Sequence, residues 1–160
     1  MKRDTLKKWL SLLPTLLVML VIFSMSAQNS TESSDLSLQA GVGLYSAENV
    51  LFRRGWSAAY ILYLSETNSV YIRKAAHFLE YMLLGITMYF PCRAFEKKGL
   101  KRFLISLCVC AGYAALDEFH QMFVNGRFPS IIDAGIDSLG ACCGILLTYA
   151  PRLHTGGGSA

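Results

Sequence analysis

The stretch FLISLCVCAGYAALDEFHQMFVNGR, residues 103–127, decides how the rest of the chain is interpreted. Its first part is apolar enough to lie in a membrane, whereas DEFHQMFVNGR, residues 117–127, carries two acids, a histidine, a glutamine and an arginine. An apolar helix that ends in such a cluster is typical of a transmembrane span with a polar site or an ion-paired network at one end.

The composition of the whole chain also indicates a membrane protein. Of its 160 residues, 53% are hydrophobic and only 16% are charged, whereas a soluble domain carries about 25% charged residues. Four stretches approach the roughly 17 to 25 residues that cross a bilayer; they are residues 9–27, 77–95, 103–119 and 131–149. We therefore predict an all-α, polytopic membrane protein, with a four-transmembrane-helix bundle in residues 1–150 and a flexible tail at 151–160.

Lysine and arginine residues set the predicted orientation, because short cytoplasmic segments retain them. Four precede the first predicted span, and five lie between the second and the third. Both termini are therefore predicted in the cytoplasm, with residues 28–76 and 120–130 outside. The net charge of +4 follows from this arrangement, and no basic-aromatic pattern accompanies it, so we predict no nucleic-acid partner. The basic residues are Lys2, Arg3, Lys7 and Lys8, and then Arg93, Lys97, Lys98, Lys101 and Arg102.

Two segments near the first span have alternative interpretations. Basic residues, an apolar core and the small residues SMSA (24–27) also describe a secretory signal peptide. We favour retention, because the apolar run through Ala27 is long enough to span. The stretch AAYILYL (58–64) is too short to span, so it is expected to lie on the surface or to re-enter the membrane. Its Tyr60 and Tyr63 suit the head-group level.

With this topology, three spans bring polar residues to the outer end of the bundle. His77 and Glu80 lie three residues apart at the start of the second span, and Asp133 and Asp137 lie four apart at the start of the fourth. Each pair therefore shares a helix face. The third span ends at the same level with Asp117, Glu118, His120 and Gln121.

These acids need partners, because a charged side chain at the centre of a membrane helix costs about 2.5 to 3.5 kcal/mol. The carboxylates at 117 and 118 also face the negative end of a helix dipole. Arg73, Lys74 and Arg127 are the cations closest in sequence, and a divalent metal is the other candidate. Oxygen ligands suit magnesium, calcium or manganese, and His77 or His120 would shift the preference toward manganese or zinc.

Structural interpretations also exist for these residues. Ser130 and Asp133 fit a capping box, His77 can cap a helix, and Gly140 and Gly144 fit close helix packing. The whole set can alternatively form a salt-bridged network that holds three helices in register. The five cysteines have neither CxxC nor zinc spacing, so they are expected to be small buried hydrophobic residues.

Three motifs also carry a family resemblance, namely RKAAHFLEYMLLG (73–85), DEFHQMFVNGR (117–127) and SIIDAGIDSLG (130–140). In this order and spacing they resemble VanZ-like membrane proteins, and FSMSAQNS (23–30) fits the same pattern. The resemblance implies a protein of the bacterial plasma membrane and a connection with glycopeptide, chiefly teicoplanin, resistance, without a settled reaction. His120 is at a less regular position. The family-typical polar positions are His77, Glu80, Asp117, Glu118, Gln121, Arg127, Asp133 and Asp137.

Two functions follow as hypotheses. The first is an enzyme that acts at the outer leaflet on a phosphate-containing lipid head group or lipid-linked cell-wall intermediate. A metal or a histidine-carboxylate pair would activate a nucleophile there, and cations and helix N-termini would stabilise phosphate charge. The second is a non-catalytic module that binds or occludes a peptidoglycan precursor or glycopeptide. A transporter is disfavoured, because its site would lie near the midplane.

The sequence leaves the substrate and the oligomeric state open. For the enzyme hypothesis, the catalytic candidates are His77, Glu80, Asp117, Glu118, Gln121 and Asp137. The substrate-binding candidates are Arg73, Lys74, Arg127 and Asp133.

Overall fold

The computed structural model describes residues 2–95 and 99–149, and within these ranges it contains helices and no strand. This confirms the all-α prediction. Lys97, Lys98 and the predicted tail at 151–160 lie outside the described residues. The helices are α1 (Lys2–Leu10), α2 (Leu13–Ser26), α3 (Ser30–Leu51), α4 (Ala58–Phe95), α5 (Gly99–Gln121) and α6 (Ile131–Tyr149).

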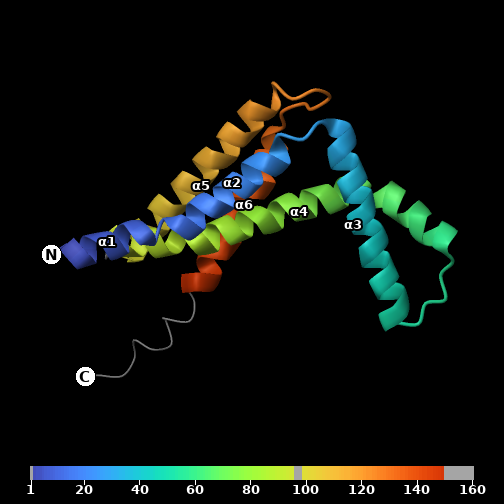
Figure 1. Ribbon diagram of the computed structural model, residues 1–160, viewed down its shortest axis with the longest axis horizontal. Helices are drawn as coiled ribbons and strands as arrows, with labels where there is room; N and C mark the ends of the chain where they lie inside the picture. Colours follow the sequence, from blue (N-terminus) through green and yellow to red (C-terminus); the bar gives the residue numbers. More distant parts are fainter. Residues whose placement is uncertain (1, 96–98, 150–160) are drawn as a thin grey trace.

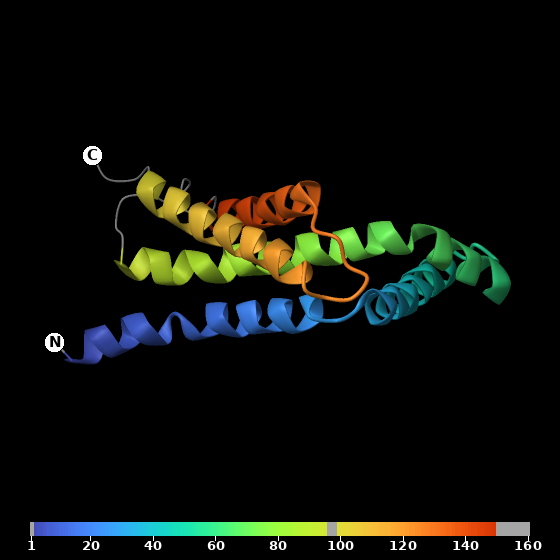
Figure 2. The ribbon, with the colours of Figure 1, turned by 90° about the horizontal axis from the view of Figure 1, so that it is seen from above.

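Four of these helices form a bundle, as Figures 1 and 2 show. The helices α2, α4, α5 and α6 lie side by side, α1 extends α2 at one end, and α3 leaves the bundle at the other. Three segments are long and apolar enough to cross a membrane: Thr5–Ser26, Gly99–Gln121 and Ile131–Thr148. These three match the first, third and fourth predicted spans. The second, 77–95, lies in α4, which does not meet the same criterion because residues such as His77, Glu80 and Arg93 lower its hydropathy.

The helix α4 is longer than the sequence analysis predicts. It runs without a break from Ala58 to Phe95, so AAYILYL (58–64) is its beginning and not a separate element. His77 is therefore well inside a helix, and the prediction that it can cap one is wrong. Residues 28–76, which are predicted to lie outside, contain all of α3, which begins with a capping box between Asn29 and Glu32.

The first predicted span, 9–27, consists of the end of α1 and all of α2, with Pro14 in the first turn of α2. N–H groups in the first turn of a helix have no intrahelical acceptor. Proline, which lacks this N–H, is therefore tolerated there. The helix is packed into the bundle: Ile22 is fully buried, and the Tyr113 hydroxyl donates a hydrogen bond to the Met19 carbonyl at 2.6 Å. The first predicted span is therefore part of the packed bundle.

Close contact between α4 and α6 depends on two glycines of α6. A Cβ atom on Gly140 would lie 2.3 Å from the backbone oxygen of Phe78, and one on Gly144 would lie 2.0 Å from another backbone oxygen of α4. The packing interpretation of this small-residue pair is therefore confirmed. Because Gly140 rests on Phe78, the nearby Asp137 is brought to the level of His77.

We expect Gly144→Ala to destabilise the protein and Gly112→Ala to leave it intact. The first change forces a methyl group into a backbone contact, and overpacking of this kind costs about 1 to 3 kcal/mol. A Cβ on Gly112 in α5 has no neighbour within 4 Å, so that change gains helix propensity alone. Thermal unfolding in one detergent, followed by circular dichroism, measures both variants. Equal melting temperatures for the two would contradict the contact.

Candidate functional site

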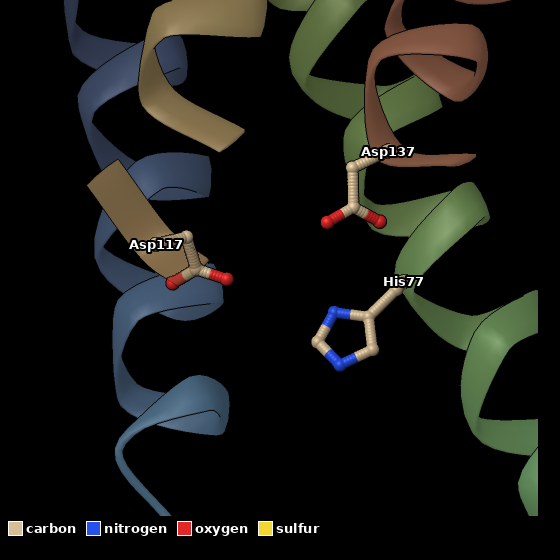
Figure 3. Close-up of side chains that lie close together, drawn as sticks. All are labelled: His77, Asp117 and Asp137. Carbon is tan, nitrogen blue, oxygen red and sulfur yellow. The ribbon is translucent and has the colours of Figure 1, made fainter. Parts of the chain in front are cut away.

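Three helices bring His77, Asp117 and Asp137 together (Figure 3). They come from α4, α5 and α6, and one ligand atom of each lies within 4.8 Å of the others. The carboxylates are only 3% and 2% exposed. Within the described residues, His77 Nδ1, Asp117 Oδ1 and Asp137 Oδ1 are buried without a hydrogen-bond partner. The three side chains therefore lie close together, but these atoms form no hydrogen bonds with one another.

The second oxygen of Asp117 is held in place from two helices. Oδ2 accepts a hydrogen bond from the Ser26 hydroxyl at 2.8 Å and another from Gln121 Nε2 at 3.2 Å. Ser26 is fully buried at the end of α2. Sequence reasoning did not select Ser26, and its only signal was its place in FSMSAQNS at the outer end of the first span. Hydrogen bonds therefore hold Oδ2 of Asp117, whereas Oδ1 remains available to the cluster with His77 and Asp137.

Glu118 connects α5 to the beginning of α6. Its Oε2 accepts a hydrogen bond from the backbone N–H of Ser130 at 2.6 Å. The Ser130 hydroxyl in turn accepts the N–H of Asp133 at 3.3 Å, which is one half of the expected capping box. The Asp133 carboxylate does not complete the box, because it pairs with Lys74. Glu118 therefore accepts the backbone N–H of Ser130, an interaction that the third residue of a capping box normally makes.

The basic side chains do not pair with the two acids at the end of α5. Within the described residues, no lysine or arginine lies within 4.0 Å of the Asp117 or Glu118 carboxylates, so the expected direct pairing is not observed. Arg127 lies in the connection between α5 and α6, and its Nε donates to the Gln28 carbonyl at 3.4 Å. Burial and the neighbouring Arg73 guanidinium lower the pKa of Arg127, and Asp117 and Glu118 oppose that shift. Two guanidinium groups therefore lie near each other without a carboxylate partner.

Most of the predicted site residues line one cavity of about 280 Å³. A second cavity of about 240 Å³ lies between the end of α2, α3 and α4. The surface that it exposes is mainly apolar, although seven of its twelve lining residues are polar or charged. Arg73, His77 and Arg127 line both cavities. The two cavities therefore border each other at these three residues. The predicted residues around the first cavity are Arg73, Lys74, His77, Glu118, Gln121, Arg127, Asp133 and Asp137.

Three predicted residues do not line the first cavity, and Asp117 is one of them. Glu80 lines the second cavity, and its Oε2 is 3.7 Å from His77 Nδ1, which is too long for a hydrogen bond. His120 stacks on Phe23 of α2, with ring centroids 4.6 Å apart, and it is not one of the three converging ligands. Tyr81 was missed: it lies one turn after His77, fully buried, with an unpartnered hydroxyl.

The VanZ/LLP1 family model matches residues 11–152, which is nearly the whole chain. The chain belongs to the VanZ-like family. This confirms the resemblance seen in its three motifs. No curated protein and no solved structure gives a significant match.

The ligand set of this VanZ-like protein fits a divalent cation. Two carboxylates and an imidazole suit manganese or zinc, and the carboxylates alone suit magnesium or calcium. Ligand atoms within 4.8 Å of one another can surround one ion at the usual ligand distances of about 2.0 to 2.6 Å. A cation would also offset the penalty of several kcal/mol for burying an unpaired charge. His77, Asp117 and Asp137 are the residues that would hold it.

For Glu118 we expect a structural role that a neutral amide can keep. Glu118→Gln retains an oxygen that accepts the Ser130 N–H, whereas Glu118→Ala leaves that N–H without its acceptor. Loss of a cap costs about 1 kcal/mol, so the alanine variant should have the lower melting temperature and the glutamine variant should stay near wild type. If both variants melt together well below wild type, the carboxylate charge matters more than the cap.

Proposed function

We propose that this VanZ-like protein acts on the phosphate-containing head group of a membrane lipid or lipid-linked cell-wall intermediate at the outer face of the bacterial plasma membrane. One observation carries the proposal: the cluster of His77, Asp117 and Asp137 adjoins a cavity in which Arg73 and Arg127 have no carboxylate partner. Acids alone would repel a phosphate. Guanidinium groups beside them bind its oxygens in two-point geometry.

We infer that α4 supplies a fourth membrane crossing. Figure 1 shows that α2 and α5 both end near the beginning of α6, whereas α4 ends and α5 begins at the opposite end. Two spans that run in the same direction require a return crossing between them, and α4 is the segment that connects the two ends. The opposite end carries basic residues of α1 and of the ends of α4 and α5, which favours the cytoplasm for that end and the outside for the site. These residues are Lys7, Lys8, Arg93, Lys101 and Arg102.

Different residues would have different roles in a phosphoryl or head-group transfer. A bound divalent cation would supply positive charge to the phosphate and to the attacking oxygen. Arg73 and Arg127 would bind phosphate oxygens. As the attacking oxygen bonds to phosphorus, the bond to the leaving oxygen breaks. In the alternative without a cation, Asp137 would accept the proton of the attacking hydroxyl, and a protonated His77 would donate one to the leaving oxygen.

The second cavity supports a lipid in preference to a soluble phosphate compound. Its lining includes Met25, Leu36, Ala40, Ile72 and Ala76, and it continues from the basic residues that border the polar cavity. An apolar chain attached to a bound phosphate would therefore have an apolar surface beside it. Chemistry on such a lipid would alter the envelope and hence tolerance to glycopeptides, chiefly teicoplanin.

A non-catalytic module that binds or occludes a peptidoglycan precursor or glycopeptide is the second candidate. Two of the predicted reactive or binding acids already have structural partners, since Glu118 caps α6 and Asp133 pairs with Lys74. Fewer groups are therefore free for chemistry than the sequence analysis predicts. The remaining cluster would suffice to bind an anionic or metal-bridged ligand.

We expect a cysteine placed at Asn125 to react from outside the cell and one placed at Lys98 not to react. In the sequence, Asn125 follows α5 and position 98 directly precedes it. The measurement uses an impermeant maleimide on intact cells, with the native cysteines replaced by alanine. Permeabilised cells provide the control, in which both positions should react. Labelling of Lys98→Cys alone in intact cells would invert the topology and place the site in the cytoplasm.

For activity, we expect Asp137→Asn to abolish turnover and Asp133→Asn to retain it. Loss of an acid-base or ligand group lowers rates by about 100-fold or more, whereas the asparagine at 133 loses only the ion pair with Lys74. Purified protein is incubated with a bacterial lipid extract, with and without chelator, and new head-group species are detected by mass spectrometry. Asp137→Asn should fold with unchanged or higher thermal stability.

The outcomes distinguish the two functions. Turnover that chelator removes and divalent metal restores supports the metal-assisted enzyme. Saturable lipid binding without product over long incubation would favour the binding module. Full turnover by a well-folded Asp137→Asn protein would exclude the cluster as the reactive site.

A further inference from the structure

We propose that α3 and the beginning of α4 form an interfacial arm, residues 30–64, which lies on the outer surface of the membrane and binds anionic phospholipid head groups at its tip, residues 50–60. This inference does not depend on the proposed enzyme function. It extends to α3 and to the tip the surface position that the sequence analysis considers for AAYILYL (58–64).

The arm is a defined hairpin that leaves the bundle sideways. Figure 1 shows α3 starting beside the end of α2 and then running across the bundle direction, not onward along it. The Asn29 side chain accepts the Glu32 N–H at 2.9 Å, which sets the point where the chain turns into α3. Along the arm, a Cβ on Gly41 would lie 3.0 Å from the Ser65 Cβ, so α3 packs closely on α4. A helix in this direction suits the plane of the membrane surface.

One face of α3 is apolar and uncovered. Leu36, Ala40, Leu44, Ala47 and Leu51 follow one another at spacings of three or four residues, so they share a helix face. Leu44 is 58% exposed and Leu51 is 76% exposed. Leu36 and Ala40 also border the apolar cavity together with the end of α2. The apolar face of α3 is therefore continuous with the side of the arm that faces a membrane span.

Aromatic rings and arginines are concentrated at the tip. Trp56 packs edge-on against Tyr60 at 5.7 Å and against Tyr45 at 6.4 Å, and Tyr60 stacks on Tyr63 at 6.3 Å. The Arg54 guanidinium lies 5.7 Å from the centre of the Trp56 ring. Rings with one apolar and one polar edge, mixed with arginine, are typical of the head-group region. The composition therefore fits a lipid surface better than bulk water.

Arg53 provides the positive charge of the tip that has no acidic partner. Arg54 pairs with Glu48 at 3.2 Å, whereas Arg53 has no carboxylate within 4.0 Å among the described residues. Arg53 also has a φ of 49°, in the left-handed region that follows many helices and that glycine normally occupies. An arginine therefore takes a position where glycine would fit with less strain. Attraction to lipid phosphate gives a reason for the charge.

A second copy of the chain is the competing occupant for this surface. The bilayer is favoured because Thr5–Ser26, α5 and most of α6 meet the criteria for membrane spans and the apolar face of the arm adjoins the end of α2. In water, the tip would expose Val50 (78%), Leu51 (76%) and Phe52 (62%) together. Contiguous apolar surface of this kind marks an interaction site.

The test uses the two tryptophans of the protein, Trp9 and Trp56. Trp9→Phe leaves Trp56 as the only reporter, and the full-length protein is reconstituted into phosphatidylcholine vesicles with and without phosphatidylglycerol. Lipids brominated near the head group or deep in the acyl chain report the depth of the ring. We expect blue-shifted emission, stronger quenching by the shallow bromines, and little quenching by aqueous acrylamide. Trp56→Phe, with Trp9 as reporter at the other end of the bundle, is the matched control.

Two further variants test the charge. Arg53→Gly keeps the left-handed backbone and should lose the increase in bromolipid quenching that phosphatidylglycerol causes, whereas Arg53→Lys should keep it. An equal increase in Arg53→Gly and wild type would overturn the head-group part of the proposal. Water-like emission with full acrylamide quenching would overturn the arm itself. Protection that disappears as the protein is diluted in lipid would assign the surface to a second copy.

Discussion

The backbone contact between α4 and α6 is the constraint on which the site depends. Gly140 and Gly144 have no side chain, so α6 can approach α4 until its backbone meets carbonyl oxygens of that helix. Within a bilayer, apolar side chains gain little by leaving lipid, so close packing of this type contributes much of the association. The same approach brings Asp137 to His77. A wider spacing between α4 and α6 would separate the two groups and leave the cluster open.

The acids at the end of the bundle where α6 begins have two different roles. Glu118 and Asp133 are used locally, the first to cap α6 and the second to pair with Lys74, and both hold the start of α6 near α4 and α5. This part of the structure agrees with the structural network considered for the sequence. Asp117 and Asp137 differ, because each keeps a buried oxygen without a partner. A purely structural network would satisfy those oxygens, since a buried unpaired charge is destabilising.

Hydrophobic runs and helical spacing predict much of this fold. They locate the three segments now identified as candidate spans. The four-residue spacing of Asp133 and Asp137 also puts both on one face of α6, and both line the polar cavity. The remaining features depend on tertiary contacts. The polar composition of residues 28–57 conceals α3, which is stabilised by a capping box and by packing on α4. Ser26 could not be selected either, because its role is defined by Asp117, which is 91 residues away in the chain.

Only some of the basic side chains near this cluster of acids are paired with a carboxylate. Lys74 and Arg54 are already paired with carboxylates, so they add little to the binding of an anion. Arg73 and Arg127 have no carboxylate partner within 4.0 Å among the described residues, and both border the polar and the apolar cavity. Pairing them with Asp117 and Asp137 would stabilise the bundle and remove both the anion site and the ligand cluster. The separation of these charges at one end of the bundle does not serve the stability of the helices, and it is the observation that supports the proposed phosphate and cation.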